Sequence, residues 1–476
     1  MPAPDQGERW DLPDRSLKFA PSSDARIARI RRTTVGGKKT GAAVTARPVE
    51  RLFPQDPSRT IPDLTPPSRA LHHRFLSDRK QPGAMTASPF ALGADLRALL
   101  DDSRQNNVDL LRALAITAVF IHHGQHVFGG NVPFFGASGG WFGVQLFFVI
   151  SGYLISASCE KHGLRDYAIH RFFRIVPAYL FFFLAIGIRA RVVTAGAIAA
   201  DPWAFIINLA FLQHLFPAAL MKFDVLHVTW TLTVEVLWYV LAPLLLIGNR
   251  TLRWPTVLIA VLVSTAWVYM ASTGALDFLY PGTSDTNPGQ AYLFVVNHFL
   301  AQVVFFVFGA WIHFHRQAVA RINPVLSLSL ALLVFLALPY YLVFNPMFVT
   351  GIGIALLLVT ALNSQPIRSR IVFWISETSY AIYLCHFPMM LWVRDRLGWE
   401  GMAGALAALM GSLILASLSY VLIERPFVRI GRRMTRSPPP KTAHEGGNQG
   451  ELAARHRAAS EPEWPVRRGS NPRHSA

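Results

Sequence analysis

Two ionisable side chains, Arg112 and His123, lie in one apolar stretch that begins near Val108. They are eleven residues apart, and at 100° per residue this separation falls within about 20° of three whole helical turns. On a helix both side chains would project from one face, about 16 Å apart, whereas His122 would point elsewhere. Ionisable groups are costly inside a membrane, so these two residues predict a functional site.

The two side chains suit different steps of one reaction. His123 titrates near neutral pH and could act as a general base or as a nucleophile that carries a transferred group transiently. The alternative for His123 is a histidine that hydrogen-bonds a backbone carbonyl. Arg112 stays charged and must meet an anion, either a substrate group or Asp109 one turn earlier. A base for a hydroxyl and a cation for a developing anion are groups that many transfer reactions need.

Two further polar residues interrupt later apolar segments. Glu235 lies about 12 Å inside the outer end of its segment, at 1.5 Å per residue, and His386 lies at a comparable depth. A buried carboxylate must be paired or protonated, so Glu235 could orient His123 or pair with a cation. His386 could transfer a second proton or contact the acceptor, and a structural histidine before Pro388 is the alternative.

A basic segment before the third apolar stretch carries Arg171 and Arg174 in an Arg-x-x-Arg pattern. We expect a turn here, at the cytoplasmic end of the span. Guanidinium groups suit phosphate geometry, which would allow the pair to bind the phosphates of a donor. An ordinary positive-inside turn would explain the same charges. The phosphate interpretation therefore depends on a family resemblance.

The order of these motifs resembles that of the acyltransferase 3 family of integral-membrane acyltransferases. The resemblance rests first on Arg112 and His123 with ten residues between them, on the GVQLFFVISGYLI segment at 143–155, and on the pair Arg171 and Arg174.

Later segments extend the resemblance over nearly the whole apolar region. WTLTVEVLWY at 230–239 is similar to the family's tryptophan-to-glutamate motif, and residues 383–388 match its Tyr-x-x-His-x-Pro element. YVLIERP at 420–426 resembles the close of the family's last helix. The chain departs from the pattern at Gln145, where an acidic residue is common, and at Trp238, where phenylalanine is. We assign no catalytic role to Gln145.

The resemblance implies a membrane-bound acyltransferase. It would move an acyl group, expected to be acetyl, from cytoplasmic acyl-coenzyme A to a hydroxyl of a surface or exported carbohydrate, glycolipid or other glycosylated molecule. The implied donor substrate is acetyl-coenzyme A, with no permanently bound cofactor and no metal. The candidate catalytic residues are His123, Arg112, Glu235 and His386, and the candidate donor-binding residues are Arg171 and Arg174.

Two other possibilities stay open at this stage. Because no further enzyme domain is expected in residues 437–476, a separate extracytoplasmic partner could complete the transfer. A multi-span transporter of a modified glycan or small metabolite is the alternative function, since many spans with buried charges also describe a substrate pathway.

The composition is typical of a membrane protein. Hydrophobic residues make up 52% of the 476-residue chain, and the net charge is +17. The basic residues concentrate at the termini and in short turns, as the positive-inside rule expects, so we expect a lipid bilayer and no nucleic acid as partner. Cys159 and Cys385 are the two cysteines and lie in apolar segments, which argues against a disulfide framework or a thiolate metal site.

The apolar periodicity predicts an all-α, polytopic bundle of about ten spans in the cell membrane, with both termini cytoplasmic. Residues 203–216 form a half-length apolar stretch that could be interfacial or re-entrant; a full crossing there would invert the later topology. The expected spans are 108–128, 139–158, 175–188, 228–247, 256–271, 293–314, 325–343, 347–362, 372–393 and 402–423.

Three regions follow from these patterns. Residues 106–427 would form the acyltransferase domain. Residues 1–100 and 428–476 are basic, lack periodicity and have a composition that predicts disorder. Translation could begin at Met85; otherwise the N-terminal region would be a basic cytoplasmic tail near anionic lipid.

Overall fold

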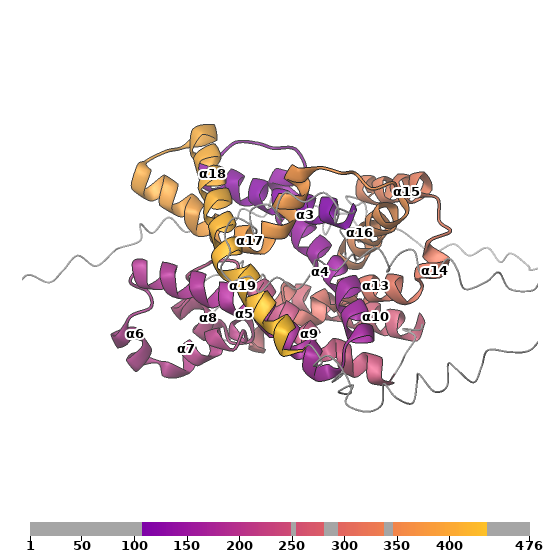
Figure 1. Cartoon of the computed structure of the whole chain (residues 1–476), viewed down its shortest axis with the longest axis horizontal. Helices are drawn as coiled ribbons and strands as arrows, with labels where there is room; N and C mark the ends of the chain where they lie inside the picture. Colours follow the sequence, from indigo (N-terminus) through magenta and orange to yellow (C-terminus); the bar gives the residue numbers. More distant parts are fainter. Residues whose placement is uncertain (1–106, 249–253, 280–293, 338–345, 436–476) are drawn as a thin grey trace, which may run out of the picture. The chain divides into compact units, whose positions relative to one another are not determined.

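The computed structural model describes residues 107–248, 254–279, 294–337 and 346–435. The regular elements within these ranges are all helices (Figure 1). A short 3₁₀ helix, η4 (Asp277–Leu279), belongs to a separate unit of the chain, and the other described residues form one compact unit. The expected disorder of 1–100, the proposed start at Met85 and the tail beyond residue 435 lie outside the described residues.

Each of the ten expected spans corresponds to a helix in its described part; residue 293 and residues 338–343 lie outside the described residues. The helices are α3 (Asn107–Phe128), α4 (Phe135–Lys161), α5 (Leu164–Arg189), α9 (Trp230–Gly248), α10 (Trp254–Ser272), α13 (Phe299–Phe314), α15 (Pro324–Ala337), α16 (Pro346–Asn363), α17 (Arg370–Leu397) and α18 (Gly401–Ser419). A short helix, α14 (Arg316–Val319), follows α13.

Length and composition qualify fewer helices as membrane spans. Among the described residues, five helical segments are long and apolar enough: 138–161, 164–189, 254–272, 294–314 and 401–434. Three shorter apolar helices lie at 230–245, 324–337 and 348–363. The remaining two, α3 and α17, carry Arg112, His123 and His386, so polar site residues lower the hydropathy of these helices. The chain is thus a multi-pass helical protein, and length and composition alone do not establish ten spans.

The structure corrects one expected boundary. Helix α5 begins at Leu164, so Arg171 and Arg174 lie on the helix itself instead of in a turn before it. Asp166 in the first turn of α5 favours this early start because a carboxylate stabilises a helix N-terminus. At the other end, the described part of the chain continues beyond residue 427 in helix α19 (Arg425–Met434).

The segment between α5 and α9 contains short pieces only. They are α6 (Ala195–Ala200), α7 (Pro202–Leu209), the 3₁₀ helix η3 (Gln213–Leu215) and α8 (Pro217–Lys222). A bilayer needs about 20 helical residues, and α7 has eight. The Asn208 side chain donates to the carbonyls of Ala204 and Ala219, both at 2.9 Å, which closes the turn after α7. Residues 203–216 therefore do not form one spanning helix.

Helices α4 and α13 approach closely at two glycines. A Cβ at Gly152 would collide with the Phe306 carbonyl, and a Cβ at Gly309 would collide with the Val149 carbonyl. Small residues allow this approach between membrane helices. The contact fixes α4, which forms one wall of the site.

We expect Gly152→Val to disrupt the packing of α4 on α13, because a larger side chain must displace backbone that cannot move independently. The measurement is the yield of monodisperse protein after detergent extraction. Gly163→Val is the matched control, since a Cβ at Gly163 meets nothing within 4 Å. Equal yields for the two variants would contradict the close approach of the helices.

Candidate active site

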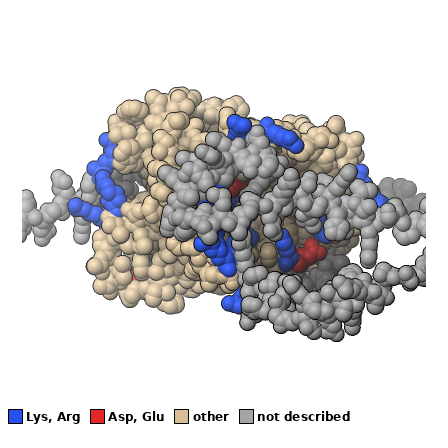
Figure 2. Space-filling view, in the orientation of Figure 1, with Lys and Arg blue, Asp and Glu red and all other residues tan. Residues whose placement is uncertain are grey.

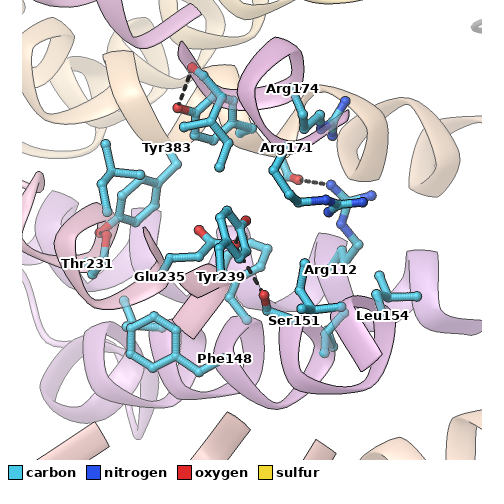
Figure 3. Close-up of a pocket in the computed structure, with 18 residues that line it drawn as sticks. Arg112, Phe148, Ser151, Leu154, Arg171, Arg174, Thr231, Glu235, Tyr239 and Tyr383 are labelled. Atoms are coloured by element: carbon cyan, nitrogen blue, oxygen red, sulfur yellow. Dashed lines mark hydrogen bonds between the residues drawn. The ribbon is translucent and has the colours of Figure 1, made fainter. Parts of the chain in front are cut away.

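A cavity of about 200 Å³ lies between α3, α4, α5, α9 and α17. In Figure 3, the side chains of Arg112, Arg171 and Arg174 lie together on one side of the cavity, and Thr231 and Tyr383 lie on the other. Apolar side chains from α4 fill much of the wall between the two sides. They are Val144, Phe147, Phe148, Ile150, Leu154 and Ile155.

Arg112 reaches the cavity from α3 and is held by α17. Its Nη2 donates to Ser379 Oγ at 3.1 Å, and Ser379 Oγ donates to the Ser376 carbonyl at 2.7 Å. The carboxylate of Asp109 accepts from Ser376 Oγ at 2.7 Å. Arg112 and Asp109 thus each form a hydrogen bond with a serine of α17, and the Arg112 guanidinium faces the cavity.

Arg171 is positioned by aromatic rings. Its guanidinium carbon lies 5.9 Å from the ring centroids of Tyr167 and of Tyr239, a distance at which cation–π attraction operates. Its Nη2 also donates to Ser158 Oγ at 3.4 Å. The Tyr167 hydroxyl donates to the Tyr239 carbonyl at 3.0 Å, which fixes one ring relative to the other helix. The rings hold Arg171 at the cavity without neutralising its charge.

Arg174 forms an ion pair with a residue that sequence reasoning had not singled out. Its Nη1 lies 3.8 Å from Glu424 Oε2, and the Glu424 side chain is fully buried. Neither carboxylate oxygen of Glu424 has a hydrogen-bond partner among the described residues. Glu424 closes a π-helix, η6 (Tyr420–Glu424), and the wider turn sets which side chains of the helix face α5. The YVLIERP motif includes this glutamate, but no periodicity of the apolar residues predicts the π-turn.

Glu235 is held by hydroxyl groups. Tyr239 Oη and Ser151 Oγ both donate to its Oε1 atom, the latter at 3.2 Å. The carboxylate lines the same cavity as the three arginines. Of the two alternatives for Glu235, the structure shows no hydrogen bond to His123, whose partner is another imidazole, and it places the carboxyl group in the cavity with the arginines.

His123 and His386 form a hydrogen-bonded pair outside the cavity lining. His123 Nδ1 lies 2.8 Å from His386 Nε2. His386 Nδ1 lies 2.8 Å from the Tyr383 carbonyl and 3.2 Å from the Ile382 carbonyl. A carbonyl only accepts, so His386 Nδ1 carries a hydrogen and its Nε2 is the acceptor when the ring is neutral. His123 must then donate from Nδ1, which leaves the lone pair on His123 Nε2.

The adjacent histidine has a different environment. His122 Nδ1 bonds the Gly136 carbonyl of α4 at 2.8 Å, whereas His123 bonds α17 and packs against the edge of Phe387 at 5.1 Å. Arg112 and His123 both contact α17. The predicted shared face of Arg112 and His123, and the different direction of His122, are therefore confirmed.

Tyr383 lies between the cavity and the imidazole pair. Its ring lines the cavity, and its carbonyl accepts from His386. Its hydroxyl accepts from Thr231 Oγ1 at 2.9 Å and donates to the Val228 carbonyl at 3.1 Å. The structure therefore joins two chemical units through one residue: a cationic cavity that suits an anion and an imidazole that can accept a proton.

Comparison with known proteins gives one family match. The profile of the acyltransferase 3 family, described as an acyltransferase domain, matches residues 105–423. The match covers all the helices that line the cavity and ends at Ile423, one residue before Glu424. No solved structure matches the chain.

Several characterised proteins are similar to the chain. The peptidoglycan O-acetyltransferase OatA of Listeria monocytogenes is 26% identical over 373 residues, which cover 68% of this chain and 56% of that protein. Nodulation protein 10 of Rhizobium leguminosarum is 26% identical over 68% of this chain and 94% of its own length. The exopolysaccharide production protein ExoZ of Rhizobium meliloti is 27% identical over 61% and 90%. The chain thus spans little more than half of the Listeria protein.

Proposed function

The chain belongs to the acyltransferase 3 family, and from this premise we propose that it is a membrane-bound acyltransferase. It transfers an acyl group, expected to be acetyl, from cytoplasmic acyl-coenzyme A to a hydroxyl of a surface or exported carbohydrate. The observation that carries the proposal is the arginine-lined cavity that adjoins the imidazole pair through Tyr383. Relatives named for peptidoglycan O-acetylation and exopolysaccharide production support a carbohydrate acceptor.

The charge of the cavity supports an anionic donor. Three arginines and one carboxylate, that of Glu235, are among the described residues that line it. Acyl-coenzyme A carries several phosphates, for which guanidinium groups are well suited. The apolar wall formed by α4 offers room for the uncharged arm and the acyl group. A transporter has no comparable support, since the family match indicates an acyltransferase.

The imidazole pair supports a direct transfer. The acceptor hydroxyl gives its proton to His123 Nε2 while its oxygen attacks the thioester carbonyl. The tetrahedral intermediate then collapses, the carbon–sulfur bond breaks, and the departing thiolate takes up the proton. The products are an ester and a free thiol. In the acyl-carrier alternative, His123 Nε2 itself attacks the thioester and the hydroxyl attacks the acyl-imidazole.

The remaining site residues have supporting roles in this proposal. Arg112 lies where a cation could stabilise the oxyanion or hold the donor. His386 is a positioning residue, because its Nε2 fixes the tautomer of His123. Glu235 lines the cavity beside the arginines, and hydrogen bonds from Tyr239 and Ser151 hold its carboxyl group in place. A separate extracytoplasmic partner would deliver the acceptor where one is needed.

The pairing of α3 with α17 supports ten spans. Three hydrogen bonds join the two helices in the same order along each: Asp109 with Ser376, Arg112 with Ser379 and His123 with His386. Helices α3 and α17 are therefore parallel. Parallel helices require an odd number of crossings between them. The seven expected spans between α3 and α17 satisfy this rule, and an eighth crossing at 203–216 would violate it. This topology directs Arg112 inward and His123 outward, with both termini in the cytoplasm.

Reporter fusions test the topology. A fusion after Arg321 or Arg370 should be cytoplasmic, and a fusion after Gly130 or Gly398 should be external. The readout is paired activity of a reporter that works only inside and one that works only outside. Reversed readings after Arg321, with an external reading at Gly130 unchanged, would show an additional crossing before α13.

We expect Arg171→Gln combined with Arg174→Gln to weaken donor binding about tenfold or more, because each charge-assisted hydrogen bond to phosphate contributes about 1.5–3 kcal/mol. The measurement is equilibrium binding of coenzyme A to the purified protein. Arg189→Gln, at the opposite end of α5, is the control. If the double variant binds coenzyme A as tightly as wild type does, the two arginines do not bind the donor and serve only to set the membrane topology.

His123→Ala should lower acetyl transfer by about 10²–10⁴-fold, because the reaction loses its base. His122→Ala should retain activity, since His122 faces α4. The assay follows label from acetyl-coenzyme A into the carbohydrate fraction of membranes, normalised to the amount of extracted protein. A folded, inactive His122→Ala protein would refute the assignment.

His386→Gln and His386→Asn separate positioning from proton transfer. A glutamine oxygen can take the place of imidazole Nε2 and accept from His123, whereas the shorter asparagine cannot reach. Neither amide transfers a proton. We therefore expect the glutamine variant to keep activity within about tenfold of wild type and the asparagine variant to lose about as much as His123→Ala. Equal loss in both folded variants would show that His386 itself transfers a proton.

A further inference from the structure

Helix α19 packs against the beginning of α5, next to the arginines of the cavity. Gly431 lies beneath the Phe173 ring, where an added Cβ would be 3.0 Å from the nearest ring atom. Phe427 stacks on Phe173 with ring centroids 6.4 Å apart, and Thr435 Oγ1 lies 2.8 Å from His170 Nε2. These contacts fix α19 beside the helix that carries Arg171.

Four of the ten residues of α19 are arginines. At 100° per residue, Arg425, Arg429 and Arg432 lie within about 60° of one another, and Arg433 borders the same face. Arg432 and Arg433 are exposed. Basic side chains gather over α19 on the face of the molecule seen in Figure 2. The helix therefore presents a cationic face, here called the α19 arginine face and defined by Arg429, Arg432 and Arg433.

The α19 arginine face lies close to the basic end of α5. Arg171 and Arg432 both interact electrostatically with His170. Nearby, burial lowers the pKa of His162, which lies between α4 and α5, and the charges of Lys161 and Arg171 lower it further, while Asp166 opposes them. Positive charge thus continues from the cavity arginine Arg171 to the surface of α19.

The size of the cavity shows that a donor must extend beyond it. Sites for drug-sized ligands have volumes of about 300–1,000 Å³, and this cavity holds about 200 Å³. Coenzyme A is larger than a typical drug, with a diphosphate and a 3′-phosphorylated adenosine at one end of a long arm. When the acyl end and the arm occupy the cavity, the nucleotide has to lie outside it.

We propose that the α19 arginine face binds the 3′-phosphorylated nucleotide of acyl-coenzyme A, while Arg171 and Arg174 hold the part of the donor nearer the arm. The inference rests on the proposed function, because it names where that donor's nucleotide lies. The 3′-phosphate is then recognised outside the cavity, by residues of the last described helix, α19. An anionic lipid headgroup offers similar phosphate chemistry, and the experiment separates the two.

The experiment compares three probes, coenzyme A, 3′-dephospho-coenzyme A and pantetheine, for equilibrium binding to full-length protein in neutral detergent. The variant is Arg432→Gln with Arg433→Gln. We expect it to bind coenzyme A about tenfold or more weakly than wild type does. Its affinities for 3′-dephospho-coenzyme A and pantetheine should match those of wild type within about twofold, because the lost contact is with the 3′-phosphate.

Two controls accompany the double variant. Arg321→Gln removes an exposed arginine outside α19 and should bind all three probes as wild type does. The melting temperature of each variant should stay near that of wild type, since the Gly431 contact with Phe173 is unchanged. A variant that melts early is replaced by Arg432→Lys with Arg433→Lys, which keeps charge but loses paired hydrogen bonds and should show a smaller loss for coenzyme A alone.

Three results would overturn the inference. An equal loss for all three probes would mean that α19 supports the fold and makes no contact with the 3′-phosphate. Unchanged binding of coenzyme A, with wild type still preferring it to the dephospho form, would locate the phosphate site elsewhere. A difference between the variant and wild type that is absent in detergent and appears only when the binding assay is repeated in vesicles containing anionic lipid would identify a headgroup site. Failure of wild type to bind coenzyme A at all would instead contradict the proposed function.

Discussion

The pairing of α3 with α17 is the contact on which the rest of the site depends. Hydrogen bonds between helices are a main source of specific packing in a membrane, where lipid is as apolar as the side chains. Three polar contacts join this pair, and each uses a different chemical group of α3: the carboxylate of Asp109, the guanidinium of Arg112 and the imidazole of His123. Sliding either helix by one turn would break all three.

This pairing also couples the two chemical units. Arg112 faces the cavity because Ser379 accepts its hydrogen bond. His123 has a defined tautomer because His386 Nε2 accepts a hydrogen bond from its Nδ1. Tyr383, one turn before His386 on α17, contributes its ring to the cavity and its carbonyl to the imidazole pair. Movement of α17 would therefore alter the arginine-lined cavity and the imidazole pair together.

Much of this arrangement follows from local sequence patterns. Apolar periodicity located the helices, and the eleven-residue spacing put Arg112 and His123 on one face, since helical geometry alone decides that. Periodicity could not reveal which helix would meet this face, so the role of His386 as the partner of His123 was not predicted. For the same reason the partner of Glu235 was left open between His123 and a cation, and its hydrogen bonds come from Tyr239 and Ser151. Glu424 was missed because a π-turn breaks the 3.6-residue period from which faces are counted.

In the reaction that we propose, the donor enters from the cytoplasm and the acceptor reacts at the outer side of the membrane, near His123. Sealed inside-out membrane vesicles test this directly when labelled acetyl-coenzyme A is added to the medium. The account predicts labelled carbohydrate that a glycan-degrading enzyme in the medium reaches only after the vesicles are opened, and no such label with His123→Ala. Labelled carbohydrate that the enzyme removes from intact vesicles would contradict transfer across the membrane.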